Sequence, residues 1–320
     1  MATDDKFLQA DKDGHFRRPE SKFRGTIPSD EYPAEASRYV LYLNFGCPWA
    51  QRTNIVRTLK GLEDIVELVE VDDMDPGPGK GWYFSGQFGP DKDPYTGAKY
   101  LRELYLRDDA DFTGRTTVPT LWDKKSGTIV NNESSEIIRM FYSAFDHLLP
   151  ATEREDSKGS AGLLPLNLRD EIDEMNQWVY DTVSNGVYKC GFATTQEAYD
   201  QNIGPIFASL DRLEEHLAHP RYPGPYLFGE HITEADIRLF PTLIRFDIGY
   251  YLLFMVNLKM IRYDYPRLHL WLRLLYWDES PATKGAFKTT TKFDRYKHGF
   301  SKVKGHAIVP AGPVPAIYPL

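Results

Sequence analysis

The chain has 320 residues, of which 42% are hydrophobic and 26% are charged, and its formal net charge is −8. This composition is typical of a globular protein with a sizeable core, and the length predicts roughly two domains. The acidic balance argues against nucleic-acid binding, and no apolar run approaches the roughly 20 residues that a membrane helix needs. The acidic N-terminus predicts neither a secretory signal nor a transit peptide, and two cysteines without a disulfide framework predict free thiols in a reducing, cytoplasmic compartment.

The first elements predict a strand–helix–strand unit. Residues 1–36 are polar and irregular and are interpreted as an N-terminal extension. The apolar run "RYVLYLNF" (38–45) predicts a buried strand that ends at Gly46. Pro48 suits the first turn of a helix, which Gly61 is expected to cap. "IVELVEV" (65–71) predicts a second strand.

A long excursion, a helix, a hairpin and another helix follow. Residues 72–98 are rich in Gly, Pro and Asp and predict a long loop, a feature that is often functional. "YLRELYLR" (100–107) predicts a helix, and "TVPTLWDKKSGTIV" (117–130) predicts a hairpin around a Lys-Lys-Ser-Gly turn. "NESSEIIRMFYSAF" (132–145) opens a further helix. Together with the preceding unit, this order predicts a small mixed α/β sheet.

The second half is dominated by helical periodicity. The polar stretch 151–162 is the candidate linker. Apolar residues then recur every three or four positions in "EAYDQNIGPIFASLDRLEEHL" (197–217). Thr233 and Asp236 have the spacing of a helix cap and its third residue, which predicts another helix start. We therefore expect an all-helical second domain.

Cys47 lies between the first strand and the first helix, in "NFGCPWAQR". A thiolate is the nucleophilic form of cysteine, and a helix N-terminus lowers the pKa of a thiol. A buried structural cysteine is the commoner case for an intracellular chain, but this placement favours a function. Ala50 stands where a Cys-x-x-Cys motif has its second cysteine. Cys47 therefore needs an external thiol to resolve a mixed disulfide, and glutathione is the obvious cytosolic candidate.

Three other stretches fit a glutathione site, each with a simpler alternative. In a thioredoxin-like sheet the Val118–Pro119 bond is expected to be cis, although a trans proline at a strand start is commoner. Glu133 and Ser134 offer groups for an ammonium and a carboxylate at a helix start, or they form an ordinary cap. Arg115 is a candidate partner for a carboxylate, or it is simply solvated.

These motifs resemble the glutathione transferase superfamily and, more narrowly, its Xi class, the glutathionyl-hydroquinone reductases. The resemblance is carried by "NFGCPWAQR", "GWYF", "DPYTGAKYLRELY", "GRTTVPTLWDKKSGTIVNNESSEIIRMF", "GVYKCGFATTQEAY" and "IRFDIGYY", and it extends from about residue 47 to 310. It implies a homodimer with the glutathione transferase fold, in which a thioredoxin-like α/β N-terminal domain precedes an all-α C-terminal domain. With the extension, the expected parts are 1–36, 37–150, 163–298 and a C-terminal tail, 299–320.

The resemblance also implies roles for particular residues. Cys47 attacks the sulfur of a glutathionyl-hydroquinone, Tyr188 donates a proton to the leaving aromatic ring, and Tyr250 helps to hold the thiolate. Glutathione is the co-substrate, and no metal is implied. The implied glutathione-binding residues are Trp82, Arg115, Thr116, Thr117, Val118, Glu133 and Ser134. Without the family, the two tyrosines would be interpreted as core residues, and Trp82, after Pro76-Gly77-Pro78-Gly79, as a loop anchor.

One segment departs from the family pattern. Gly299-Phe300-Ser301 stands where the family carries a His-Tyr-Tyr step that adds a tyrosine to the thiolate site, and Tyr296 is out of register. Three functions remain open on these residues. The first is a glutathionyl-hydroquinone reductase, and the second is an omega-like thioltransferase or dehydroascorbate reductase. The third is a non-catalytic binder of aromatic ligands.

Overall fold

A computed structural model describes residues 10–75 and 80–320 of the chain. The Pro-Gly-Pro-Gly stretch at 76–79 and the first nine residues of the expected extension lie outside the described residues. The chain divides into two compact units. One is Glu20–Ser157, and the other combines residues 10–19 with Lys158–Leu320.

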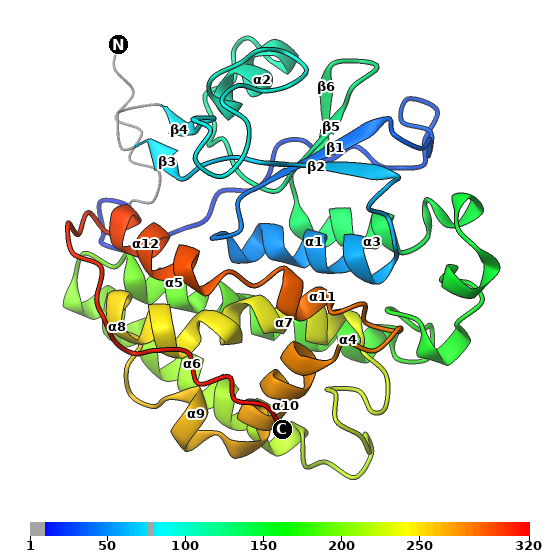
Figure 1. The fold of residues 1–320 in the computed structure, drawn as a ribbon. Helices are drawn as coiled ribbons and strands as arrows, with labels where there is room; N and C mark the ends of the chain where they lie inside the picture. The colour runs from blue at the N-terminus through cyan, green and yellow to red at the C-terminus, as the bar shows by residue number, and fades with distance from the viewer. Residues whose placement is uncertain (1–9, 76–79) are drawn as a thin grey trace. The chain divides into compact units, whose positions relative to one another are not determined.

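The first unit contains a mixed four-stranded sheet in the order β2-β1-β5-β6 (Figure 1). β1 runs parallel to β2 and antiparallel to β5, which pairs antiparallel with β6. All residues of β1 are buried, which explains its continuous apolar run. The strands are β1 (Tyr39–Leu43), β2 (Val66–Glu70), β5 (Thr120–Asp123) and β6 (Thr128–Asn131). The sheet that was predicted from the sequence is therefore confirmed.

Three α-helices accompany this sheet. α1 and α3 pack together on one face (Figure 1), whereas α2 contacts β6 and β4. Their bounds are α1 (Pro48–Leu59), α2 (Leu101–Asp108) and α3 (Ser134–Ser143), and short 3₁₀ turns follow at Asp146–Leu148 and Ala151–Glu153. α1 ends where the sequence predicts, and Gly61 follows it with a φ of 64°.

The stretch 72–98 is more ordered than the loop predicted from its Gly and Pro content. It carries a two-stranded sheet of β3 (Met74–Asp75) and β4 (Gly81–Trp82). The buried Asp72 carboxylate accepts hydrogen bonds from the backbone N–H groups of Ser85 (2.6 Å) and Phe88 (2.8 Å). Asp72 thus orders the part of the segment around residues 85–88, because its carboxylate supplies acceptors that the loop backbone lacks.

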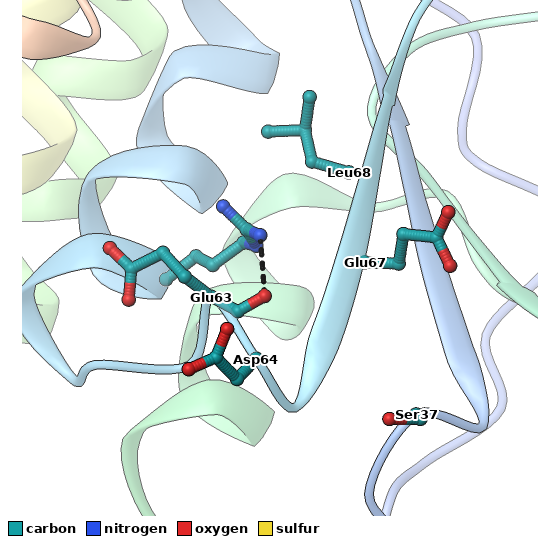
Figure 2. Close-up of a pocket in the computed structure, with 6 residues that line it drawn as sticks. Ser37, Glu63, Asp64, Glu67 and Leu68 are labelled. Atoms are coloured by element: carbon teal, nitrogen blue, oxygen red, sulfur yellow. Dashed lines mark hydrogen bonds between the residues drawn. The ribbon is translucent and has the colours of Figure 1, made fainter.

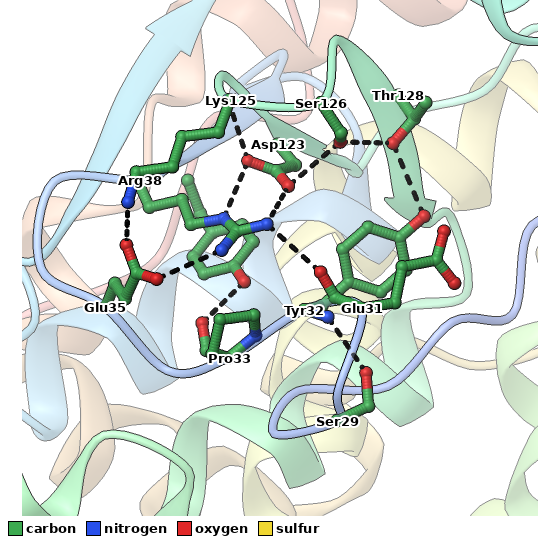
Figure 3. A network of polar contacts seen from close by, with 11 residues as sticks. Ser29, Glu31, Tyr32, Pro33, Glu35, Arg38, Asp123, Lys125, Ser126 and Thr128 are labelled. Carbon is green, nitrogen blue, oxygen red and sulfur yellow. Dashed lines mark hydrogen bonds and ion pairs between the residues drawn. The ribbon is translucent and has the colours of Figure 1, made fainter.

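A polar network lies around the turn that joins β5 and β6 (Figure 3). Arg38 donates from Nε (2.9 Å) and Nη2 (2.6 Å) to the two carboxylate oxygens of Asp123. The Asp123 side chain is fully buried, and the Arg38 side chain is 9% exposed. Burial alone raises the pKa of Asp123, but the hydrogen bonds from Arg38, the Lys125 backbone and Ser126 outweigh it, so the pKa lies below its ordinary value.

The second unit is helical, as predicted. Its helices are α4 (Arg169–Val179), α5 (Gly186–Gly191), α6 (Gln196–His216), α7 (Glu234–Arg245), α8 (Tyr251–Leu253), α9 (Ile261–Asp264), α10 (Pro266–Trp277), α11 (Ala286–Thr289) and α12 (Phe293–Val303). A 3₁₀ turn spans Gly159–Ala161, and π-helical segments span Tyr180–Ser184 and Phe246–Tyr250. The predicted cap of α7 is confirmed, because Asp236 accepts hydrogen bonds from the Thr233 N–H (2.9 Å) and hydroxyl (3.0 Å). Within the described part of the chain, no helix is both long and apolar enough to cross a bilayer.

Candidate functional site

Cys47 occupies the cap position of α1, directly after β1 and the loop 44–46. The loop is shaped by Asn44, whose backbone carbonyl accepts the Cys47 N–H (3.0 Å). The Asn44 side chain accepts the Gly46 N–H (2.8 Å) and donates to the carbonyl of Val71 (2.9 Å). A short polar side chain after a buried strand therefore fixes the turn that presents the sulfur.

The thiol faces the start of β5. Cys47 Sγ donates to the carbonyl of Val118 at 3.4 Å, and the Val118–Pro119 peptide bond is cis. Cys47 is half-buried, and the first turn of α1 holds no acidic residue. The open N–H groups and the dipole of a helix N-terminus favour an anion at this position.

The second cysteine has a different environment. Cys190 lies in α5 of the helical unit and is fully buried. Burial raises the pKa of its thiol to about 12. Cys190 is therefore protonated at neutral pH, and its reactivity is low.

Tyr105 of α2 holds the segment that enters β5. Its hydroxyl donates to the Thr117 carbonyl (3.0 Å) and lies 2.8 Å from the Thr120 hydroxyl. Asn132 donates both to the Tyr105 hydroxyl (3.3 Å) and to the Thr117 hydroxyl (3.2 Å). Burial raises the pKa of Tyr105, so this phenol stays protonated. Neither Tyr105 nor Asn132 was predicted, because their importance depends on contacts between separate elements.

The predicted pair Glu133 and Ser134 opens α3. Glu133 is the cap residue, and its Oε1 accepts from the backbone N–H (3.1 Å) and hydroxyl (2.9 Å) of Ser135. Its Oε2 accepts from the hydroxyl of Ser21 at 3.1 Å. Ser134 is buried in the first helical turn. Ser21 was missed, since nothing in the sequence indicates that residues 20–25 lie beside α3.

The remaining predicted glutathione-binding residues occupy several places in the same unit. Arg115 is half-buried and precedes Thr116, which is 4% exposed. The buried Thr116 hydroxyl has no hydrogen-bond partner among residues 10–75 and 80–320. Trp82 lies on β4 opposite Met74 and is 9% exposed. The binding roles of these residues stay predictions.

Tyr188 and Tyr250 belong to an aromatic cluster of the helical unit. Their ring centroids are 6.1 Å apart, and Tyr250 lies 5.1 Å from Phe254 and 5.0 Å from Phe300. Phe300 belongs to the segment 299–301, in which the sequence departs from the family pattern. From α12, its phenyl ring faces Tyr250. Tyr296 is buried elsewhere, with its ring centroid 3.7 Å from the Arg245 guanidinium carbon. The roles of both cluster tyrosines toward Cys47 also stay predictions.

A recess of about 300 Å³ lies at the other end of β1 (Figure 2). Ser37 lines it before β1 starts, whereas Cys47 follows the end of that strand. Acids outnumber bases by three to one in its lining, which consists of Ser37, Arg57, Glu63, Asp64, Glu67 and Leu68. It is therefore separate from the thiol and poorly suited to the carboxylates of glutathione. Across the described ranges, no cluster of three or more His, Cys, Asp or Glu residues could hold a metal ion.

Comparisons with known proteins give a consistent result. The model of the glutathione S-transferase N-terminal domain matches residues 46–144, and that of the C-terminal domain matches residues 196–274. "Glutathione S-transferase omega-like 2" of Schizosaccharomyces pombe is 45% identical over 96% of both chains. "Glutathionyl-hydroquinone reductase YqjG" of Escherichia coli is 45% identical over 82% of this chain and 79% of the relative. The crystal structure of glutathione-S-transferase Xi from Phanerochaete chrysosporium superimposes with a TM-score of 0.88 at 48% identity, covering 98% of this chain and 97% of that one.

Proposed function

Because the chain belongs to the Xi class of the glutathione S-transferase family, we propose that it is a glutathionyl-hydroquinone reductase with Cys47 as its nucleophile. It is a glutathione-dependent enzyme. The observation that carries the proposal is the single half-buried thiol at the cap of α1, 3.4 Å from the Val118 carbonyl and without a cysteine at position 50. A monothiol site of this kind requires a second, soluble thiol to complete a catalytic cycle.

We propose that glutathione binds along the ends of α1, β5 and α3. The Glu133 carboxylate pairs with the ammonium of the ligand, and the start of α3 at Ser134 binds its carboxylate. The backbone of Val118 lies beside the sulfur of the tripeptide. Arg115, with the hydroxyls of Thr116 and Thr117, and Trp82 complete the site. The buried Thr116 hydroxyl supports this assignment, because a buried donor needs a partner and a ligand would supply one.

The proposed reaction has two steps. The Cys47 thiolate attacks the sulfur of the glutathionyl group, and the bond between sulfur and the aromatic carbon breaks with its electron pair on the carbon. That carbon takes a proton from the Tyr188 hydroxyl, which releases the hydroquinone and leaves a mixed disulfide on Cys47. A second glutathione attacks this disulfide, gives its thiol proton back to the tyrosinate, and leaves as oxidised glutathione. Over both steps the aromatic carbon is reduced, and the sulfur of the glutathionyl group and the thiol of the second glutathione are oxidised to a disulfide.

The test uses a glutathionylated hydroquinone with excess glutathione. Cys47→Ala is expected to abolish release of free hydroquinone, because no other described thiol lies at a helix start. Cys190→Ala is the matched control and is expected to retain turnover, since its thiol is buried and protonated. If the Cys47→Ala protein cleared the substrate as fast as the wild type, the proposed nucleophile would be wrong.

An omega-like thioltransferase is the second candidate, and the name of the Schizosaccharomyces pombe relative favours it. The same cysteine would serve small mixed disulfides or dehydroascorbate, but no aromatic carbon would need a proton. Tyr188→Phe separates the two functions. A lower but measurable turnover on the aromatic substrate alone supports the reductase, whereas equal retention on both substrate types supports the thioltransferase.

We also propose a homodimer in the cytoplasm, as expected for the family. The small-molecule partners are then glutathione and glutathionylated quinols or other aromatic compounds. The molar mass in solution tests the dimer, and it should be twice that of the chain.

A further inference from the structure

The segment that precedes the sheet unit in the chain is built into the helical unit. The Thr194 N–H donates to the Gly14 carbonyl at 3.1 Å, and Gly14 has a φ of 85°. A Cβ at Gly14 would lie 2.5 Å from the Thr195 hydroxyl, so only glycine fits there. Phe16 is 2% exposed, and its ring lies 5.6 Å from that of Phe192. Residues 14–16 are thus fixed against α5 and the start of α6.

This anchoring places Arg18 on Tyr188. The Arg18 guanidinium carbon lies 4.8 Å from the centroid of the Tyr188 ring. Its Nε donates to the side chain of Asn185 at 3.1 Å. Asn185 is also the cap residue of α5, and its carbonyl accepts the Tyr188 N–H at 3.0 Å. Asn185 therefore orients both the Arg18 guanidinium and the helix that carries Tyr188.

We propose that Arg18 is a positioning residue that acts through Tyr188. It fixes the ring and favours the negative charge that the ring acquires when the hydroxyl gives up its proton. This inference rests on the proposed function, in which Tyr188 protonates the leaving aromatic carbon. A guanidinium over an aromatic face is attracted to the neutral ring, and it is attracted more strongly to a tyrosinate, whose charge spreads into the ring. The interaction is thus stronger after proton transfer than before it, as a contribution to rate requires.

Two lysines and a tyrosine near Tyr188 make other contacts in the described part of the chain. Lys304, which follows the last residue of α12, donates to the Gly191 carbonyl and lies 5.2 Å from the Phe192 ring, and burial lowers its pKa. Lys189 donates to the Asp181 carbonyl at 3.0 Å. Tyr250 faces Tyr188 as another ring, 6.1 Å away. Among the described residues, Arg18 has its guanidinium over the Tyr188 ring itself.

A double-mutant cycle tests the proposal in the full-length protein. Arg18→Gln is expected to lower kcat on a glutathionylated hydroquinone by about tenfold, and Arg18→Lys is expected to recover part of that loss. In a Tyr188→Phe background, Arg18→Gln should change kcat by less than about twofold, because a residue that acts through Tyr188 has nothing left to act on. Arg17→Gln is the control, since Arg17 pairs with the exposed Asp11 and Asp13 on the same segment and should leave kcat unchanged.

The possible outcomes have distinct meanings. If Arg18→Gln costs the same factor with and without the Tyr188 hydroxyl, or costs nothing, the inference is overturned and the proposed function stands. An equal loss for Arg17→Gln also overturns it, because anchoring of the segment would then explain the effect. Full turnover by Cys47→Ala, by contrast, overturns the proposed function itself. Thermal unfolding of each variant shows whether the fold is intact, and Arg18→Lys provides the comparison if Arg18→Gln is destabilised.

Discussion

Asn44 holds the turn that presents Cys47, and we expect Asn44→Ala to weaken both the fold and the reactivity of the thiol. The side chain is 3% exposed and makes two hydrogen bonds, with the Gly46 N–H and the Val71 carbonyl. A buried neutral hydrogen bond contributes about 1 kcal/mol net, and buried groups that lose a partner add to the cost. The free energy of unfolding should therefore fall by about 2–4 kcal/mol.

Two assays measure this effect. Urea denaturation gives the free energy of unfolding, and the rate of alkylation by iodoacetamide reports on the thiolate in the folded protein. We expect slower alkylation of Cys47, because the sulfur is held at the α1 N-terminus by this turn. Asn202→Ala is the control, since the Asn202 side chain donates within α6 to the Ala198 carbonyl. An Asn44→Ala protein as stable as the wild type, with an unchanged alkylation rate, would refute the reasoning.

Three further predictions concern the rest of the fold. Because burial raises the Cys190 pKa to about 12, iodoacetamide at neutral pH should label one thiol per folded chain and two after unfolding. Equal labelling rates of Cys47 and Cys190 in the folded protein would contradict this prediction. Asp123→Asn should lower stability at pH 7 by about 3 kcal/mol, since it breaks a buried pair with Arg38. The pKa of Asp123 in the folded protein lies below its unfolded value of about 4, so the contribution to stability is present above that value and disappears as the pH falls through the folded pKa. If the difference in unfolding free energy between variant and wild type stayed constant down to pH 2, this mechanism would be excluded. Gly249→Ala should lower the stability of the protein by about 1–3 kcal/mol, because its Cβ would lie 2.7 Å from an aromatic ring of α12. Gly299→Ala lies inside α12 with open space around it and should raise the stability by about 0.5–1 kcal/mol. If calorimetry showed stability changes of the same sign for both variants, this packing would be contradicted.

Features that depend on local chemistry could be predicted from the sequence. The apolar run before Gly46 became the fully buried β1, and Pro48 opened α1. The spacing of Thr233 and Asp236 identified the cap of α7. These signals are local, because buried strands, proline at a helix start and capping pairs each act within a few residues.

Features that depend on tertiary contacts could not be predicted. Tyr105 and Asn132 meet at Thr117 only because α2, β5 and the start of α3 converge in the folded unit. The stretch 72–98 is predicted as a loop, because no sequence pattern shows that the Asp72 carboxylate accepts hydrogen bonds from the backbone N–H groups of Ser85 and Phe88. The placement of Arg18 on Tyr188 joins residues 170 positions apart, which no periodicity reveals.

The most direct test of the account uses the Cys190→Ala protein, in which Cys47 is the one remaining thiol. The protein is mixed with a glutathionylated hydroquinone in the absence of free glutathione, and the intact mass is measured. We expect a gain of one glutathionyl group on Cys47, together with one equivalent of free hydroquinone. Release of hydroquinone without that adduct, or an adduct on another residue, would contradict it.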